Sequence, residues 1–215
     1  MIPKTLYRFF SNEQYANDFI NGKIRLSTLK SCTEIEIHKG GDDLEGKMKI
    51  HIDNHVFQVS SDTDKKLLQN ATVVIRKSSP ESKMQIRMVN CTTNYKIDAN
   101  VLCFTKEPSE YILKTFGQFG VQLNNPEIFL ERVHKCLKES DPNYLGYRFN
   151  HVHYNDNSAN YLDMDALDQL GFSKRKEIFE MENEFRFLFG SKALMEVKFI
   201  NIGSISDIAS LVNFQ

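Results

Sequence analysis

The run KRKEIFEMENEFRFLFG, from Lys174 to Gly190, decides the fold that we expect for this chain. Its first half reads as a helical or coil approach. Its second half alternates polar and aromatic residues, and the side chains of a β-strand point alternately to its two faces. The two faces would carry Glu182, Glu184 and Arg186 on one side and Phe185, Phe187 and Phe189 on the other. We expect a strand with one buried apolar face and one charged face, which is either a solvated sheet edge or the floor of an active site.

The composition limits the size and the partners of the protein. The 215 residues are 41% hydrophobic, which is enough for one well-filled core. The 27 basic and 28 acidic residues nearly cancel, so the whole protein exerts no field that attracts nucleic acid or an anionic membrane, although a local basic patch is compatible with this balance. No apolar run reaches the roughly 18 residues of a membrane helix, and the start, MIPKTLYRFF, has no signal-peptide pattern. We expect a cytoplasmic protein without a membrane partner.

The cysteines and histidines predict neither disulfides nor a metal site. The four cysteines are widely spaced and form no Cys-x-x-Cys pair; they are Cys32, Cys91, Cys103 and Cys136. Two histidine pairs, one at 51 and 55 and one at 151 and 153, have no third ligand nearby in the pattern. We therefore expect reduced structural thiols and no bound metal.

Strands and helices are expected to follow one another irregularly along the chain. Strands are predicted over residues 5–10, 23–29, 101–105, 117–123, 151–154, 184–189 and 195–200, with a hairpin over 47–59 that turns at Asp53-Asn54. Helices are predicted after the capping box at 11–14, over 108–116, from Pro126 onward and over 205–212, and residues 31–46 are predicted to be a loop. Without strict βαβ alternation, this order predicts a single α+β domain over residues 1–215, with a mixed or mostly antiparallel sheet and peripheral helices.

Two short stretches near the amino end place polar groups next to apolar strands. Arg8 lies among aromatic residues, where burial is costly unless the guanidinium meets an anion; the alternative is an edge residue whose guanidinium reaches water. The loop GGDDLEG carries three carboxylates that either bind a cation or form a solvated turn, namely Asp42, Asp43 and Glu45. Because the chain has no Walker motif and no G-x-G-x-x-G after a strand, ATP hydrolysis and Rossmann chemistry are disfavoured.

The third polar stretch is the Glu182-x-Glu184-x-Arg186 row. On a strand, the two carboxylates lie about 7 Å apart on one side. One can orient a hydroxyl or nucleophile while the other stabilises a developing positive charge, as in sugar chemistry. Arg186 would keep one carboxylate ionised or contact a phosphate. The alternative is a charge ladder on an exposed sheet face.

Together, these stretches resemble a bacterial family. The motifs, in order, are Leu6-Tyr7-Arg8-Phe9, Lys23-Ile24-Arg25-Leu26-Ser27-Thr28, Asp42-x-x-Glu45-Gly46, Leu102-Cys103-Phe104-Thr105, Gly120-Val121, Val152-x-Tyr154 and Lys176-x-x-Phe179-x-x-Glu182-x-Glu184-x-Arg186. This series is similar to the bacterial domain-of-unknown-function family numbered twenty-nine seventy-one and to the abortive-infection AbiGi-type proteins. The family often has His at the position of Arg8, Trp at that of Phe179, and Asn-Asp at that of Gly41-Asp42.

The family's layout resembles that of ADP-ribosyltransferases, which implies a split sheet, NAD as the substrate and no metal. In the arginine-serine-glutamate branch of those enzymes, an early arginine grips the NAD phosphates, and a Ser-Thr pair supports the nicotinamide pocket. The second glutamate of a Glu-x-Glu motif is the catalytic carboxylate. The resemblance therefore implies Arg8, Ser27 and Thr28 as NAD-binding residues and Glu182 and Glu184 as the catalytic pair. We also expect Tyr7 and Arg186 in the NAD-binding group, Arg186 because it can contact a phosphate.

Three functions stay open from the sequence. The first is a bacterial defence or toxin-type enzyme that transfers ADP-ribose from NAD to a protein or nucleic-acid acceptor. The second is a non-catalytic binding module, an antitoxin or a phage-component sensor, with a partner from a toxin–antitoxin or phage-defence operon. The third is a nuclease whose metal ligands are the carboxylates of the acidic loop together with Glu182; the chain shows no basic groove to hold a nucleic-acid strand.

Overall fold

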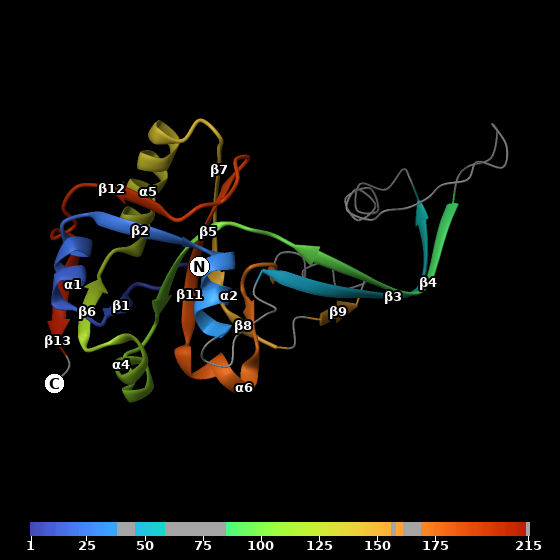
Figure 1. Ribbon diagram of the computed structural model, residues 1–215, viewed down its shortest axis with the longest axis horizontal. Helices are drawn as coiled ribbons and strands as arrows, with labels where there is room; N and C mark the ends of the chain where they lie inside the picture. The colour runs from blue at the N-terminus through green and yellow to red at the C-terminus, as the bar shows by residue number, and fades with distance from the viewer. Residues whose placement is uncertain (38–45, 59–84, 156–157, 161–168, 214–215) are drawn as a thin grey trace. The chain divides into compact units, whose positions relative to one another are not determined.

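The computed structural model describes residues 1–37, 46–58, 85–155, 158–160 and 169–213 (Figure 1). The chain divides into two compact units. The first comprises Met1–Gly46, Ile97–Asp156 and Gly171–Gln215, and the second comprises Lys47–Lys96 and Asn157–Leu170. The α+β class with a mostly antiparallel sheet is confirmed, whereas one domain over residues 1–215 stays a prediction.

The second unit is a three-stranded sheet built on a long hairpin-like pair. Strand β3 (Lys47–Gln58) pairs antiparallel with β4 (Gln85–Lys96) and parallel with β9 (Ser158–Asn160). The predicted turn at Asp53-Asn54 is wrong, because β3 continues through it and Asn54 pairs with Val89 of β4. Because β3 continues as one long strand paired with β4, strand formation overrides the turn propensity of Asp53 and Asn54.

The first unit is built on an eight-stranded sheet whose pairings are all antiparallel. Six strands follow in the order β12 (Lys198–Asn201), β2 (Lys23–Thr28), β5 (Asn100–Thr105), β1 (Leu6–Phe10), β6 (Phe119–Leu123) and β13 (Ala209–Asn213). On its other edge, β5 pairs with β11 (Glu184–Ser191), which pairs with β7 (Tyr144–His151). A small parallel pair joins β8 (His153–Tyr154) and β10 (Ser173–Lys174).

The sheet is split at β5. One edge of this strand is shared by two neighbours, because Thr105 near its end pairs with Tyr7 of β1, while Val101 near its start pairs with Ser27 of β2. Cys103 lies between these two pairings and is paired with no residue of β1 or β2. The split leaves the Cys103 carbonyl to a side chain rather than to a neighbouring strand, and this is where the candidate site forms.

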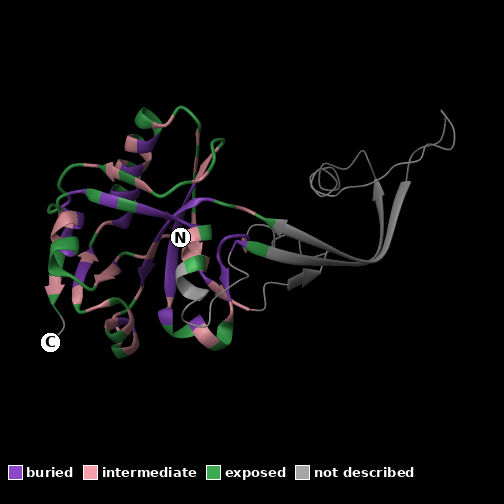
Figure 2. Ribbon diagram, viewed as in Figure 1, coloured by how far each residue is buried: buried purple, intermediate pink, exposed green. Residues whose placement is uncertain are grey.

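The main core lies between one face of the sheet and two helices, α1 (Glu13–Ile20) and α5 (Pro126–Ser140). Buried residues dominate the central strands (Figure 2). As the alternation of the sequence predicts, three phenylalanines of β11 enter this core, namely Phe185, Phe187 and Phe189. A smaller apolar cluster on the opposite face contains Leu29, Ala99, Val101, Phe172 and Leu188. The charged residues of β11 therefore share their face of the sheet with this second cluster.

Two predicted elements are wrong, and both errors have a physical cause. Residues 31–46 were expected to be a loop, but helix α2 (Leu29–Ile37) begins there. Thr28 and Ser31 cap each other, since each side-chain oxygen accepts a hydrogen bond from the other residue's backbone N–H at 2.9 Å. The closing helix expected over 205–212 is instead a turn followed by β13. The edge strand β6 is open to a partner on this side, and Ser210 and Val212 of β13 pair with Gln122 and Gly120 along it.

The remaining helices are short and agree with the sequence. Helix α4 (Glu110–Phe116) follows its cap Ser109, and α6 (Lys176–Phe179) leads into the 3₁₀ turn η2 (Glu180–Glu182). Helix α1 begins where expected, but its cap is Asn12 and not Ser11 of the predicted capping box, because the Asn12 side chain accepts a hydrogen bond from the Gln14 N–H. None of the helices in the described parts of the chain has the length and apolar character needed to cross a lipid bilayer.

Candidate functional site

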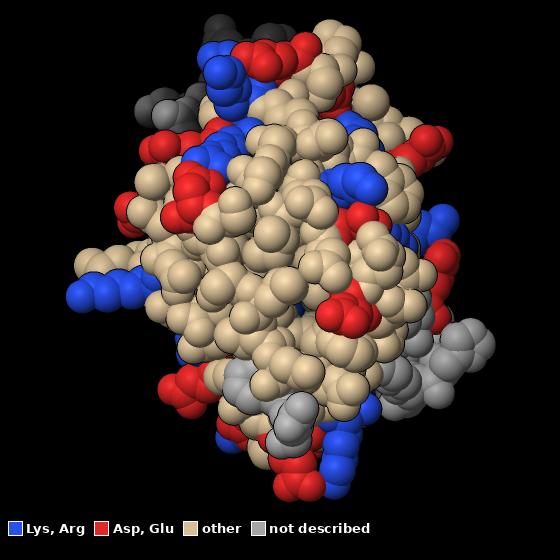
Figure 3. Space-filling view, turned by 90° about the vertical axis from the view of Figure 1, so that its left-hand side faces the viewer, with Lys and Arg blue, Asp and Glu red and all other residues tan. Residues whose placement is uncertain are grey.

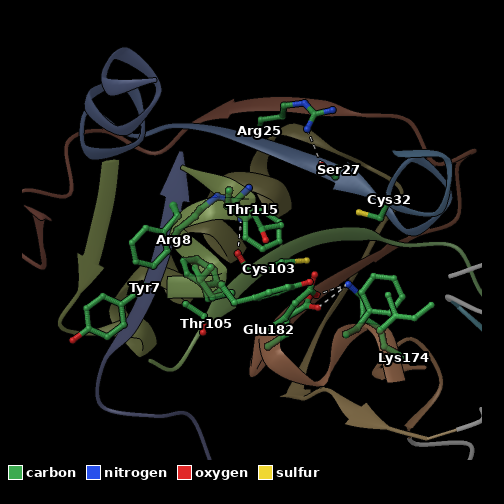
Figure 4. Close-up of a pocket in the computed structure, with 18 residues that line it drawn as sticks. Tyr7, Arg8, Arg25, Ser27, Cys32, Cys103, Thr105, Thr115, Lys174 and Glu182 are labelled. Carbon is green, nitrogen blue, oxygen red and sulfur yellow. Dashed lines mark hydrogen bonds and ion pairs between the residues drawn. The ribbon is translucent and has the colours of Figure 1, made fainter. Parts of the chain in front are cut away.

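A pocket of about 360 Å³ opens in the first unit, at the split between β1 and β2. Its wall is assembled from strands β1, β2, β5, β10 and β11, from helices α2, α4 and α6, and from η2 (Figure 4). The charged residues that line it are Arg8, Arg25, Lys174, Glu182 and Glu184. A volume of this size falls in the range of small-molecule sites, about 300–1,000 Å³. The pocket therefore combines ligand-sized space with charged groups from distant parts of the sequence.

Arg8 fills the split in the sheet. Its Nη1 donates a hydrogen bond of 2.6 Å to the carbonyl oxygen of Cys103, the group that neither neighbouring strand satisfies. Its guanidinium carbon also lies 5.7 Å from the ring centre of Phe10 and 5.8 Å from those of Phe19 and Phe104. Burial lowers the pKa of Arg8, although a guanidinium keeps its charge at any physiological pH. A positive charge held among aromatic rings provides an anchor for an anion.

The end of β2 brings a second arginine and a hydroxyl to the pocket. Arg25 Nη1 donates a hydrogen bond of 2.9 Å to Ser27 Oγ, and both residues line the cavity. Thr28, the other predicted member of the Ser-Thr pair, does not line it. The Thr28 side chain is buried at the start of α2, where Oγ1 accepts the Ser31 N–H. Thr28 therefore shapes the wall through α2 and has no direct access to the cavity.

The opposite side of the pocket is a buried ionic network. Lys174 Nζ lies 2.8 Å from Glu182 Oε2 and 3.2 Å from Glu184 Oε2. Arg186 donates from Nε to Glu184 Oε1 at 2.6 Å and from Nη2 to Glu184 Oε2 at 3.2 Å. Arg186 also donates from Nη1 to the Gly171 carbonyl, at 3.0 Å. Because Arg186 is 0% exposed and lies behind Glu184, it supports the pocket without lining it.

The backbone around Asn183 sets the positions of the two carboxylates. Glu182 belongs to η2 and not to β11, so the expectation that Glu182, Glu184 and Arg186 share one strand face holds only for the last two. Asn183 adopts the left-handed conformation, with φ 44° and ψ 49°. The Glu184 N–H then donates to Tyr154 Oη at 2.8 Å. This turn points Glu182 and Glu184 at the same ammonium group of Lys174.

The two carboxyl groups have opposite electrostatic characters. Burial raises the pKa of Glu184, but the charges of Arg186 and Lys174 outweigh it and lower the pKa to about 2. Burial also raises the pKa of Glu182, and the nearby positive charge of Lys174 lowers this pKa by less than burial raises it. The site thus holds one carboxylate that stays ionised and one carboxyl that takes up a proton more readily, an arrangement seen where two acids divide the work of one reaction.

The structure brings together most of the predicted site residues. Five of the seven line the pocket, namely Tyr7, Arg8, Ser27, Glu182 and Glu184, whereas Thr28 and Arg186 do not. Sequence reasoning missed two lining cations, Arg25 and Lys174. Lys174 is the first residue of the run Lys174–Gly190, but nothing in the pattern of that run marks it as buried. Its burial follows from the pairing of β10 with β8, a two-residue strand too short to give a periodic signal.

The acidic loop cannot be compared with the pocket, because Asp42, Asp43 and Glu45 lie outside the described residues. Within the described residues, no group of three or more His, Cys, Asp or Glu side chains is arranged to hold a metal ion. The face of the molecule at the α1 and β13 end is largely uncharged at its centre, with charged side chains mostly towards its edges (Figure 3). The described residues of that face form no continuous basic surface.

Comparisons of this chain with protein-family models, with curated proteins and with solved structures find no match. The resemblance to the bacterial family and to ADP-ribosyltransferases therefore stays a prediction.

Proposed function

We propose that the pocket binds NAD and that the protein transfers ADP-ribose from NAD to a protein or nucleic-acid acceptor. One observation carries the proposal: Arg8, Ser27 and Glu184, which are far apart in the sequence, line one cavity. Residues scattered over three strands meet by chance much less readily than residues of one motif. The family resemblance adds the expected setting, which is a toxin or a phage-defence protein in bacteria.

The arginine side of the pocket suits the pyrophosphate of NAD. Within the described part of the chain, the guanidinium of Arg8 makes one hydrogen bond, from Nη1, and its other N–H groups remain for a phosphate. Arg25, which is exposed, adds a second positive charge beside Ser27. Guanidinium groups bind phosphate oxygens in bidentate fashion, and the aromatic rings around Arg8 strengthen the interaction by excluding water.

The acidic side suits the breaking of the bond between ribose and nicotinamide. That bond breaks with its electron pair leaving on the nicotinamide nitrogen, so positive charge develops on the ribose. Glu184, ionised and fixed by Arg186 and Lys174, would stabilise this charge. The acceptor then forms a bond to the ribose carbon and loses a proton. Glu182 would orient the acceptor and take this proton, since its raised pKa favours the protonated form.

A second function, a non-catalytic binding module, is favoured by the ion pairs themselves. Both carboxylates already have cationic partners in Lys174 and Arg186, so the network is complete without a substrate. In this reading, the pocket recognises a phosphate-bearing ligand, and the protein is the antitoxin or sensor of an abortive-infection system. The two functions share the arginine side of the pocket and differ only in turnover.

Labelled NAD distinguishes the two functions. The wild-type protein is incubated with NAD labelled in the adenylate phosphate and with total bacterial protein and RNA as acceptors. We expect label transfer, with a loss of about 10²–10³-fold in Glu184→Gln, the range for removing one electrostatic contact from a transition state. Glu180→Gln is the matched control, because it makes the same chemical change at an exposed side chain of the same run.

Binding is measured separately by calorimetry. Arg8→Gln should weaken NAD binding, while Glu184→Gln should retain it, and unfolding curves show whether each variant is folded. NAD that binds to the wild type without any transfer would select the binding module. Undiminished transfer by a folded Glu184→Gln variant would remove Glu184 from the catalytic role, and failure of the wild type to bind NAD would overturn the proposal.

A further inference from the structure

An exposed phenylalanine lies beside the arginine side of the pocket. Phe199 is the second residue of β12 and is 78% exposed. In the β12–β2 register, Phe199 is directly opposite Arg25, and β12 runs next to β2 in the sheet (Figure 1). Directly opposite residues of an antiparallel pair have their side chains on the same face, with Cβ atoms about 5 Å apart. Phe199 therefore lies outside the cavity but next to one of the arginines that line it.

The packing of the two strands confirms which face Phe199 is on. Ile200, the next residue of β12, packs against the main core, as do Ile24 and Leu26 of β2. Side chains alternate between the two faces of a strand, so Phe199 and Arg25 are directed away from that core. The Phe199 ring thus adds nothing to the main core and remains open to a ligand.

Hydrogen bonds fix the position of β12. Asn100 of β5 donates from Nδ2 to the carbonyl oxygen of Glu196 at 2.7 Å, which holds the segment that leads into β12. Lys198 Nζ donates to Asp141 Oδ2 at 2.5 Å, and Asp141 caps the end of α5. Phe199 is therefore an exposed ring on a fixed strand, and a ligand that covers it has little backbone to immobilise.

The strand register connects this ring to the acidic side of the pocket. Glu184 of β11 pairs with Thr105 of β5, and Ser27 of β2 pairs with Val101 of β5. Residues 101 and 105 are an even number of positions apart, so these side chains share one face, and the residue opposite Phe199 is two positions from Ser27 on β2. The strands β11 and β12 are three strand spacings apart, about 14 Å. Glu184 and Phe199 therefore lie at two ends of one face.

The cavity is small for a dinucleotide. Its volume of about 360 Å³ is near the lower end of the range for small-molecule sites, about 300–1,000 Å³. NAD consists of two nucleosides joined by a pyrophosphate. With the nicotinamide ribose at Glu184 and the phosphates at Arg8 and Arg25, the adenosine would extend beyond Arg25, on the side where β12 lies.

We propose that Phe199 is a substrate-binding residue on which the adenine of NAD stacks, outside the cavity and next to Arg25. The identity of the ligand rests on the proposed function. Nucleotide bases stack on aromatic side chains, and every base has a face that can do so. Single exposed apolar side chains are common on protein surfaces. The feature that sets Phe199 apart is its place opposite an arginine of the pocket, on the face that also carries Glu184.

Calorimetry with ADP and with inorganic pyrophosphate tests the contribution of the base. Both probes carry two linked phosphates, and only ADP has a base. We expect Phe199→Ala to weaken ADP binding about 5–30-fold, in the lower half of the range for base stacking because one side of the base stays in water. Pyrophosphate binding should not change. Phe199→Tyr keeps an aromatic ring and should bind ADP like the wild type.

Tyr15→Ala is the matched control, because it removes an exposed aromatic ring from α1, outside the pocket. It should bind ADP like the wild type. The high exposure of Phe199 makes its replacement compatible with folding, which unfolding curves verify.

The outcomes separate this inference from the proposed function. Stacking on Phe199 is overturned if folded Phe199→Ala binds ADP as tightly as the wild type, if it loses ADP and pyrophosphate binding equally, or if the wild type does not bind ADP. Transfer of label from NAD in any of these cases would keep the proposed function. A wild type that binds ADP in a Phe199-dependent way but transfers no label would support the stacking residue and overturn the transferase.

Discussion

Strands β5 and β11 have two buried faces that are built from opposite kinds of side chains. One face contributes Leu102, Phe104, Phe185 and Phe187 to the main core. The other presents Cys103, Thr105, Glu184 and Arg186 in the same register, and Glu184 and Arg186 are 5% and 0% exposed. Both faces exclude water to a similar degree, so burial does not distinguish them. The two faces differ in what offsets the cost of burying each side chain.

Apolar burial is favourable wherever it occurs, whereas a buried charge is tolerated only with a partner. Well-packed apolar residues often replace a buried ion pair without loss of stability. The Lys174–Glu182–Glu184–Arg186 network is therefore a poor explanation for how the protein stays folded. Perturbed, paired charges around a cavity are more typical of a functional site. This contrast between the faces is the physical support for placing function at the charged one.

Removing one partner from the charged face should have the largest effect. Arg186→Met leaves the Glu184 carboxylate buried with Lys174 as its remaining partner, and we expect a loss of about 3–5 kcal/mol in the free energy of unfolding. Urea denaturation of the wild type and the variant measures it. The control is the double variant Glu184→Leu/Arg186→Met, which removes both charges and should regain most of the lost stability. If Arg186→Met alone is as stable as the wild type, the Glu184 carboxylate does not depend on Arg186 to offset the cost of its burial.

The pH dependence of stability should come mainly from Glu184. Its pKa is about 2 in the folded protein, against an ordinary value of 4.5, so the folded state binds its proton less readily than the unfolded chain. The resulting stabilisation, on the order of 3 kcal/mol, is complete above pH 4.5 and is lost as the pH falls towards about 2. Glu182, with its raised pKa, works in the opposite sense.

Urea midpoints measured at several pH values test this expectation. The wild type should lose stability steeply between pH 4.5 and about 2, and Glu184→Gln should show a shallower slope over the same range. Glu180→Gln, at an exposed side chain, should keep the wild-type slope. Equal slopes in the wild type and in Glu184→Gln would show that Glu184 is not held ionised by its partners.

The same contrast explains how much of the fold could be predicted. The apolar face of β11 follows from period-two alternation, and α5 follows from Pro126 and the spacing of its apolar residues. Helix α2 was missed because its start depends on a reciprocal cap between Thr28 and Ser31, hidden in a polar stretch. Strand β13 was missed because its pattern is ambiguous alone, and only the open edge of β6 selects a strand.

The site could be predicted only in part, for a similar reason. Arg8 and Glu184 stand out because charges among aromatic residues are unusual, but a sequence does not show which charge meets which. Lys174 became a partner of Glu182 and Glu184 through the two-residue strand β10. Cys103 looked like a buried structural thiol, and its place in the pocket wall depends on strand pairings across the sheet.

The smallest expected effect concerns Asn183, which joins the helical approach to the charged face. Its left-handed conformation suits Asn and Gly, and other residues adopt it at a cost of about 1–2 kcal/mol. Its backbone is fixed on both sides, because its N–H donates to the Glu180 carbonyl and its own carbonyl accepts the Lys106 N–H, each at 3.3 Å. Asn183→Ala should therefore lower the free energy of unfolding by about 1 kcal/mol, measured by urea denaturation.

Asn183→Gly is the matched control, since glycine adopts this conformation without strain and should stay within a few tenths of a kcal/mol of the wild type. Both variants lack the Asn side chain, so a loss confined to Ala identifies the backbone as the cause. Equal losses in Ala and Gly would point to a side-chain contact of Asn183 instead. If Ala costs nothing, the turn between Glu182 and Glu184 is not fixed, and the convergence of the two carboxylates on Lys174 would not be an enforced feature of the charged face.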